Sequence, residues 1–232
     1  MLFSSPLIAG RLLKRYKRFL ADVELPTGQA VTAHCANPGS MKSCMEEGGE
    51  IWLSRSENPK RKLAYSWELA KVGEQMVCVN TAWANRLIGH ALEQKKIPEL
   101  ADDGAVRTEV KYGQNSRIDF LLEEGSRKTY VEVKSVTLAG AGHESAFPDS
   151  VTKRGQKHLI ELTKVKEEGD RAVMLFCCLR HPTESVRPAD HIDPEYGRLL
   201  RTAVSKGVEV LAYRYEVSPE GFALRGSIPV FL

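Results

Sequence analysis

Two carboxylates and a lysine at short spacing are the side chains of this 232-residue chain best suited to chemistry. Asp119 is followed after a twelve-residue gap by Glu132, and Lys134 comes two residues later. Carboxylate oxygens are preferred ligands of hard divalent cations such as Mg²⁺. If the chain brings these three side chains together, they predict a site for Mg²⁺ or Mn²⁺.

Two strands must carry these residues. Residues 116–122 and 130–136 are rich in β-branched and apolar side chains, and the polar linker between them contains Gly125, which predicts an antiparallel hairpin. A turn centred between Gly125 and Ser126 places Asp119 opposite Glu132, with Lys134 on the same face as Glu132. Opposed like charges destabilise a sheet, so we expect a divalent cation to compensate for them.

The rest of the chain divides into two predicted domains. Residues 1–80 read as short strands separated by glycine turns, which predicts a small β-barrel of the oligonucleotide-binding (OB) type. Residues 81–232 predict an α/β (α+β) domain with a mixed sheet and helices on its faces. Its expected elements are helices at 84–95, 154–168 and 194–206 and strands at 105–113, 116–122, 130–136, 171–179 and 208–213.

The excess positive charge lies in the N-terminal third. Net charge is +3, and residues 1–80 account for all of it. Five cations are interleaved with Tyr16 and Phe19, a mixture of phosphate-neutralising charges and rings on which bases can stack. We interpret this segment as a nucleic-acid contact, the alternative being a solvated strand or helix face. Its predicted contact residues are Arg11, Lys14, Arg15, Tyr16, Lys17 and Arg18.

Composition argues against several other classes. No apolar run has the roughly 18 residues of a membrane helix, and the apolar and basic stretches at the N-terminus are in the wrong order for a secretory signal. The five cysteines are odd in number and lack Cys-x-x-Cys spacing, which argues against a disulfide framework or a zinc site. We expect a cytoplasmic protein that is not bound to a membrane.

Together these residues carry a resemblance to known families. Asp119 followed by Glu132-x-Lys134 after an amphipathic helix resembles the PD-(D/E)xK nuclease superfamily, although Ile118 stands where that motif has proline. The wider set of blocks resembles the bacterial sugar fermentation stimulation protein A (SfsA) family and covers nearly the whole chain. The blocks are residues 36–41, 110–113, 116–119, 131–138, 147–149, 152–155 and 157–159.

The resemblance implies an N-terminal OB barrel followed by a restriction-endonuclease-like domain. It also implies DNA binding with little sequence preference and a regulatory link to sugar (maltose) metabolism. In a site of that kind, Asp119 and Glu132 would hold Mg²⁺, and Lys134 would orient a water or stabilise developing charge during phosphodiester hydrolysis. The third metal ligand is expected to be Glu109, with Glu93 of the preceding helix as the competitor.

Further contacts to the substrate are expected around this site. Arg154, Gln156 and Lys157 open a predicted helix, and a helix N-terminus favours phosphate. Arg117 is predicted either to contact phosphate or to neutralise the carboxylates.

Three functions remain open at this point: a Mg²⁺-dependent nuclease, a DNA-binding regulator that does not cut, and an RNA-binding or RNA-processing module. A simple salt-bridge cluster is the non-functional alternative for the site. The residues leave open whether bound DNA is single- or double-stranded and whether the chain forms a homodimer.

Overall fold

The N-terminal strands close into a barrel, as the sequence predicts. The computed structural model describes residues 1–101, 104–113 and 116–232. Strands β1, β2, β3, β5 and β4 pair in that order, and β4 pairs with both β1 and β5, so the ring is complete. Side chains alternate between interior and solvent, as in β2, where Ala21 and Val23 are buried. The strand bounds are β1 (Ile8–Tyr16), β2 (Leu20–Glu24), β3 (Ala30–Cys35), β4 (Glu50–Arg55) and β5 (Tyr65–Val72).

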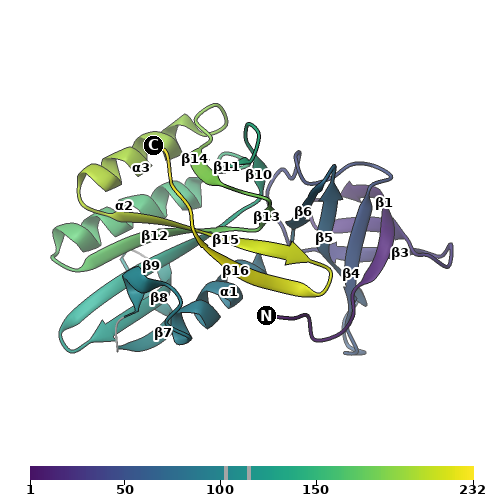
Figure 1. The fold of residues 1–232 in the computed structure, drawn as a ribbon, viewed down its shortest axis with the longest axis horizontal. Helices are drawn as coiled ribbons and strands as arrows, with labels where there is room; N and C mark the ends of the chain where they lie inside the picture. The colour runs from purple at the N-terminus through teal and green to yellow at the C-terminus, as the bar shows by residue number, and fades with distance from the viewer. Residues whose placement is uncertain (102–103, 114–115) are drawn as a thin grey trace.

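The C-terminal part is a six-stranded mixed sheet with α-helices on both faces, to the left of the barrel in Figure 1. The strand order is β16-β15-β12-β9-β8-β7, with β12 parallel to both β9 and β15. The strand bounds are β7 (Ala105–Tyr112), β8 (Ser116–Glu124), β9 (Arg127–Val136), β12 (Arg171–Cys178), β15 (Glu209–Ser218) and β16 (Gly221–Ser227). Sequence patterns predicted all of these strands except β16.

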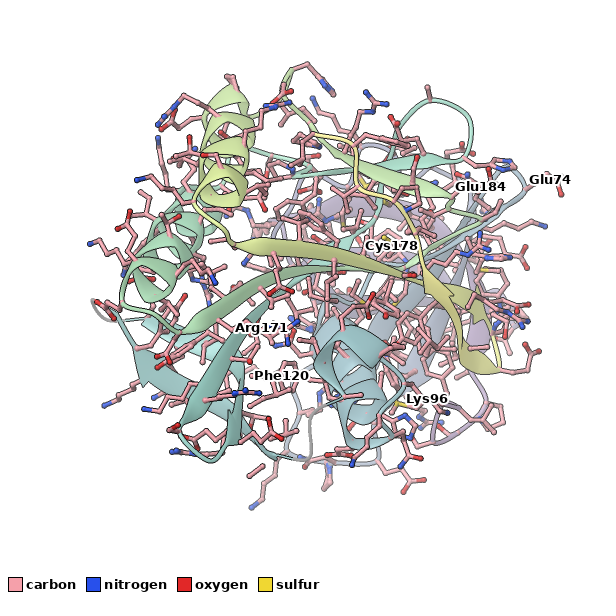
Figure 2. The ribbon with its side chains drawn as sticks, turned by 60° about the vertical axis from the view of Figure 1, so that its left-hand side comes forward. Glu74, Lys96, Phe120, Arg171, Cys178 and Glu184 are labelled. Carbon is pink, nitrogen blue, oxygen red and sulfur yellow. The ribbon has the colours of Figure 1, made fainter. Side chains whose placement is uncertain are left out.

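Each face of this sheet has its own core. Helix α1 (Ala82–Glu93) packs on one face, where the ring of Phe120 lies so close that a Cβ added at Gly89 would be 3.1 Å from it. Figure 2 shows Phe120 beside this helix. Helices α2 (Lys153–Glu167) and α3 (Pro194–Ser205) cover the other face. Among the described residues, no helix is long and apolar enough to cross a membrane.

Several short elements were not foreseen because they are too brief to show a period. They comprise the one-turn helix η1 (Pro98–Leu100), a three-stranded sheet and one of the two strands that join the domains. The small sheet is formed by β10 (Leu138–Ala139), β11 (Glu144–Phe147) and β14 (Ser185–Pro188). The joining strands are β6 (Gln75–Cys78), whose residues the sequence did predict as a strand, and β13 (Arg180–His181), which extends the barrel sheet from the C-terminal part of the chain.

Arg180 on β13 fastens the two domains together. Its side chain is buried, with 1% exposed, and its Nε donates to the carbonyl of Thr137 at 2.8 Å. The other guanidinium nitrogens donate to Gln75 Oε1 and to the carbonyl of Ser43. One buried cation therefore satisfies acceptors from both domains, and its planar set of donors suits this task better than a lysine would.

Arg180→Ala should destabilise the protein by about 2–4 kcal/mol, because truncation leaves several buried acceptors without a donor. Urea unfolding measures this change in the free energy of unfolding. Arg201→Ala is the matched control, since Arg201 pairs with Asp190 at an exposed site and its loss should cost less than about 1 kcal/mol. Equal losses in the two variants would contradict the role assigned to Arg180.

Candidate functional site

The hairpin that carries the candidate carboxylates has the predicted register. Phe120 pairs with Val131 and Glu124 with Arg127, so the strands turn about Gly125 and Ser126. The regular ladder ends at Phe120. At the next position the Asp119 side chain replaces the backbone as the partner of β9, because its Oδ2 accepts a hydrogen bond from the backbone N–H of Val133 at 2.7 Å. The two strands therefore separate where the chemistry is predicted.

Asp119 is held between the sheet and α1. Its Oδ1 accepts a hydrogen bond from Asn85 Nδ2 at 2.7 Å. Burial and the nearby Glu132 carboxylate raise the pKa of Asp119 to about 6, although the Val133 N–H, Lys134 and Asn85 work in the opposite direction. The two carboxylates are thus close enough to oppose each other's ionisation, as the predicted register implies.

The Glu132 side chain lies toward α2, where it contacts His158, and Glu132 is 2% exposed. Lys134 Nζ donates to Glu132 Oε1 at 2.5 Å, and His158 Nδ1 of α2 contacts the same oxygen. Lys134 Nζ also lies 3.1 Å from His158 Nδ1. Burial acts to raise the pKa of Glu132, but the hydrogen bond with His158 and the charge of Lys134 outweigh it and lower the pKa.

The second oxygen of Glu132 is not satisfied by any hydrogen bond within the described residues. Oε2 is buried, and nothing in the described part of the chain donates to it. A buried polar atom without a partner costs free energy, and a carboxylate is an acceptor that a cation can satisfy. Together with the Asp119 carboxylate, this oxygen fits a hard divalent cation completed by water and a substrate oxygen.

These side chains line a cleft of about 830 Å³ between the barrel and the six-stranded sheet. The barrel contributes the loop at residues 37–40, α1 contributes Asn85, and the other wall is formed by residues 146–154. Two hydrogen bonds join the walls, from Ser40 Oγ to the Asp149 carbonyl at 2.7 Å and from the Met41 N–H to Asp149 Oδ2 at 3.1 Å. The cations along the cleft are Arg15, Arg18, Lys134, Lys153 and Arg154.

The predicted basic segment divides between the cleft and the outer surface. Arg15 lines the cleft and donates to the carbonyls of Asn37 at 2.8 Å and Gly39 at 3.1 Å, so it also holds the loop that forms the wall. Arg18 is exposed and lines the cleft. Lys17 is exposed beside it but is not part of the lining.

The remaining members of this segment have partners within the barrel. Arg11 forms an exposed ion pair with Glu24 at 2.7 Å. Lys14 lies 3.9 Å from Asp22 and 5.3 Å from the centre of the Tyr16 ring. The Tyr16 hydroxyl donates to Asp22 at 3.1 Å. These three residues are less available to a nucleic acid than Arg18.

Of the residues predicted at the start of α2, Arg154 lines the cleft and Gln156 and Lys157 do not. Arg154 Nε lies 3.4 Å from His158 Nε2. Gln156 is buried and donates to Asp193, the N-cap of α3, at 2.8 Å, so it joins two helices. Lys157 lies 3.6 Å from Glu161 on the same helix.

The structure brings two of the candidate carboxylates together, and among the described residues neither Glu109 nor Glu93 joins them. Glu109 has a left-handed φ of 54° and is exposed on β7, and Glu93 is exposed near the end of α1. Neither lines the cleft, and neither does Arg117, which is exposed on β8. Within the described ranges, no three His, Cys, Asp or Glu side chains are grouped closely enough to hold a metal ion.

Sequence reasoning missed Asn85 and His158 as site residues. His158 lies one helical turn before Leu162, on the buried face of α2, so a polar residue on an apolar face was the available signal. Asn85 had no comparable signal, because its role depends on where α1 packs against β8.

Stability measured over a range of pH tests the raised pKa of Asp119. The folded state binds the Asp119 proton more tightly than the unfolded chain, because its pKa rises from 3.8 to about 6. This residue's contribution to stability is therefore greatest below pH 4 and falls as pH rises to 6. In chelator, the free energy of unfolding of the wild type should fall by about 2 kcal/mol relative to Asp119→Asn between pH 4 and pH 7. Glu93→Gln is the control, and a pH-independent difference between wild type and Asp119→Asn would refute the assignment.

Comparisons with known proteins agree with this two-part architecture. A family model described as the sugar fermentation stimulation protein RE domain matches residues 82–221, and one described as the SfsA N-terminal OB domain matches residues 13–79. A sugar fermentation stimulation protein homolog from Marinomonas sp. (strain MWYL1) is 51% identical over 232 residues, covering 99% of this chain and 90% of that protein. A homolog of the same name from Pelobacter propionicus is 54% identical, with 98% of each chain covered.

A solved structure has the same fold. It is described as the structure of Pyrococcus furiosus SfsA in complex with Ca²⁺, and it is similar to this chain with a TM-score of 0.91 at 26% identity. The similarity covers 100% of this chain and 98% of that one.

Proposed function

Since the chain belongs to the sugar fermentation stimulation protein (SfsA) family, we propose that it binds DNA in the cleft and hydrolyses phosphodiesters there with a divalent cation. The observation that carries this proposal is the pair Asp119 and Glu132, recessed in a cation-lined cleft with one Glu132 oxygen unpartnered. We further propose that the protein acts in the cytoplasm and that it has a regulatory role in sugar metabolism.

Asp119 and Glu132 are the residues that would hold Mg²⁺ or Mn²⁺. The solved SfsA structure described with Ca²⁺ supports a divalent cation in this family, because Ca²⁺ and Mg²⁺ both prefer carboxylate oxygen ligands. When bound, such a cation would polarise a phosphate and lower the pKa of a bound water. Lys134 supplies positive charge beside the reacting phosphate, and His158 keeps Glu132 in place from α2.

Little sequence preference is expected of such binding. The cleft offers Arg18, Lys153 and Arg154 to the phosphate backbone, and phosphate contacts position a protein on DNA without reading its bases. In the parts of the chain that the structure describes, no helix-turn-helix projects a recognition helix.

A DNA-binding regulator that does not cut is the second candidate. Two observations favour it: Glu132 Oε1 is already engaged by Lys134 and His158, and among the described residues no third acidic side chain is grouped closely enough with Asp119 and Glu132 to complete a metal site. An RNA ligand is a third candidate, since OB barrels bind single strands of either nucleic acid. Displacement of bound DNA by sub-stoichiometric RNA would favour that third function.

A cleavage assay separates the first two candidates. End-labelled DNA is incubated with the purified protein and Mg²⁺ or Mn²⁺, and a parallel reaction contains chelator. Asp119→Asn and Glu132→Gln should each lower metal-dependent cleavage at least about 100-fold while DNA binding persists. Glu93→Gln and Glu109→Gln are the matched carboxylate controls.

The controls are informative in themselves. A loss of cleavage in Glu109→Gln, with cleavage kept in Glu93→Gln, would identify Glu109 as the third ligand. DNA binding without any metal-dependent product, unchanged in Asp119→Asn, would exclude the nuclease and leave the non-cleaving regulator.

Binding should depend on the cations of the cleft more than on those of the outer barrel. Arg18→Ala and Arg154→Ala should each weaken DNA binding and reduce the slope of log affinity against log salt by about 1, because each removes about one phosphate contact. Arg11→Ala is the control, since Arg11 is already paired with Glu24. Fluorescence anisotropy titrations at several salt concentrations measure these slopes, and a larger effect for Arg11→Ala would place the DNA elsewhere on the barrel.

A further inference from the structure

An exposed aromatic pair lies on the barrel outside the cleft. The Phe19 side chain is 44% exposed, and its ring stacks on His34, with 6.5 Å between ring centres and 23° between ring planes. Among the described residues, the only other phenylalanine with comparable exposure is Phe231, at 51%. A large ring left in water on a monomer surface is a candidate contact for a ligand.

The turn that presents Phe19 is held in a defined conformation. Lys17 and Arg18 before it both have left-handed backbones, with φ of 46° and 64°, which non-glycine residues rarely adopt. Arg15 Nε donates to the Arg18 carbonyl at 3.0 Å, and the Cys35 N–H donates to the Phe19 carbonyl at 2.9 Å. The backbone at Phe19 is therefore fixed from both sides of the turn, and its side chain is 44% exposed.

This aromatic pair is linked to the cleft through neighbouring residues of the barrel. Arg18, the residue before Phe19, lines the cleft, and His34 lies three residues before the wall loop that begins at Asn37. Arg15 joins the two, because it bonds both to the Arg18 carbonyl and to the carbonyls of that loop. A nucleic-acid strand with a phosphate at Arg18 thus has an aromatic surface available to its neighbouring base.

We propose that Phe19 and His34 form a stacking platform for an unpaired base, and that the cleft takes single-stranded DNA in preference to intact duplex. This inference rests on the proposed function and specifies its substrate class. A base inside a duplex is stacked on both faces and paired at its edge, whereas an unpaired base offers a free face to an aromatic ring.

The depth of the cleft points in the same direction. Glu132 is 2% exposed at its base, and the hydrogen bonds between Ser40 and Asp149 tie its two walls together. A phosphate must enter between these walls to reach the carboxylates. A single strand can follow such a path, while a rigid duplex would have to bring its second strand in with the first.

A binding experiment with the full-length protein tests the platform. Fluorescence anisotropy in chelator compares a labelled single-stranded oligonucleotide with the duplex of the same sequence. Wild type should bind the single strand more tightly than the duplex. Phe19→Ala should weaken single-strand binding about tenfold, the loss expected for one stacked base, and change duplex binding less than about twofold.

Two variants control for general damage. Phe19→Trp keeps a stacking ring and should bind the single strand as well as wild type does. Phe231→Ala removes an equally exposed ring close to the C-terminus, which lies beside α3 and away from the barrel (Figure 1), and should leave both affinities unchanged. Thermal unfolding of each variant confirms that it folds.

Two results would overturn the platform. One is that Phe19→Ala weakens single-strand and duplex binding equally or leaves both unchanged. The other is that wild type binds duplex as tightly as single strand. The nuclease proposal fails separately, if single-strand binding depends on Phe19 but Mg²⁺ yields no product. A wild-type protein that binds neither DNA overturns both.

Discussion

Burial of the Glu132 carboxylate is the constraint around which the site is arranged. An ionised carboxylate that is 2% exposed is stable only if charges or donors compensate for its lost hydration. Lys134 and His158 do so at one oxygen, which fixes β9 relative to α2. Because both compensate the same oxygen, the other is buried with no hydrogen-bond partner among the described residues. Ion pairing among three side chains explains the stability of this cluster, but it does not satisfy that second oxygen.

The cleft lies at the junction between the barrel and the six-stranded sheet, which buried side chains hold together. Arg180 anchors one side of the junction, and a buried glutamate anchors the other. Glu68 of the barrel accepts hydrogen bonds from Ser54 at 2.6 Å, Asn80 at 2.8 Å and the Trp83 indole at 2.9 Å. Trp83 belongs to α1, the helix that also carries Asn85 to the Asp119 carboxylate. The barrel therefore controls the position of Asn85 through Glu68 and Trp83, although it contributes no carboxylate to the cleft.

Local sequence patterns predicted much of this structure, and there are physical reasons for the features that they did not predict. The alternation of residues 116–136 predicted the hairpin and its register, because strand pairing about a short turn has few solutions. It could not predict that Asp119 leaves the ladder to accept the Val133 N–H, or that Glu132 and Asp119 turn to different helices. Arg15 shows the same limit: its sequence neighbours suggested a phosphate contact, but its guanidinium largely serves the loop at residues 37–40. Such assignments depend on contacts between residues far apart in the chain. These contacts leave no periodic pattern in a single sequence from which they could be predicted.

The arrangement of charge favours a substrate that crosses the domain boundary. The two carboxylates and Lys134 belong to the six-stranded sheet, whereas Arg15 and Arg18 belong to the barrel. A ligand confined to the sheet would meet two carboxylates and few cations, and a polyanion would be repelled. A polyanion that spans the cleft meets the barrel cations and those at the start of α2 on either side of the carboxylates. The hydrogen bonds between the two walls of the cleft fit this arrangement, because Ser40 and Asp149 hold the two sets of cations at a fixed separation. The lining of the cleft thus combines carboxylates from the six-stranded sheet with cations from the barrel and from the start of α2, and the junction between the two parts sets their relative positions.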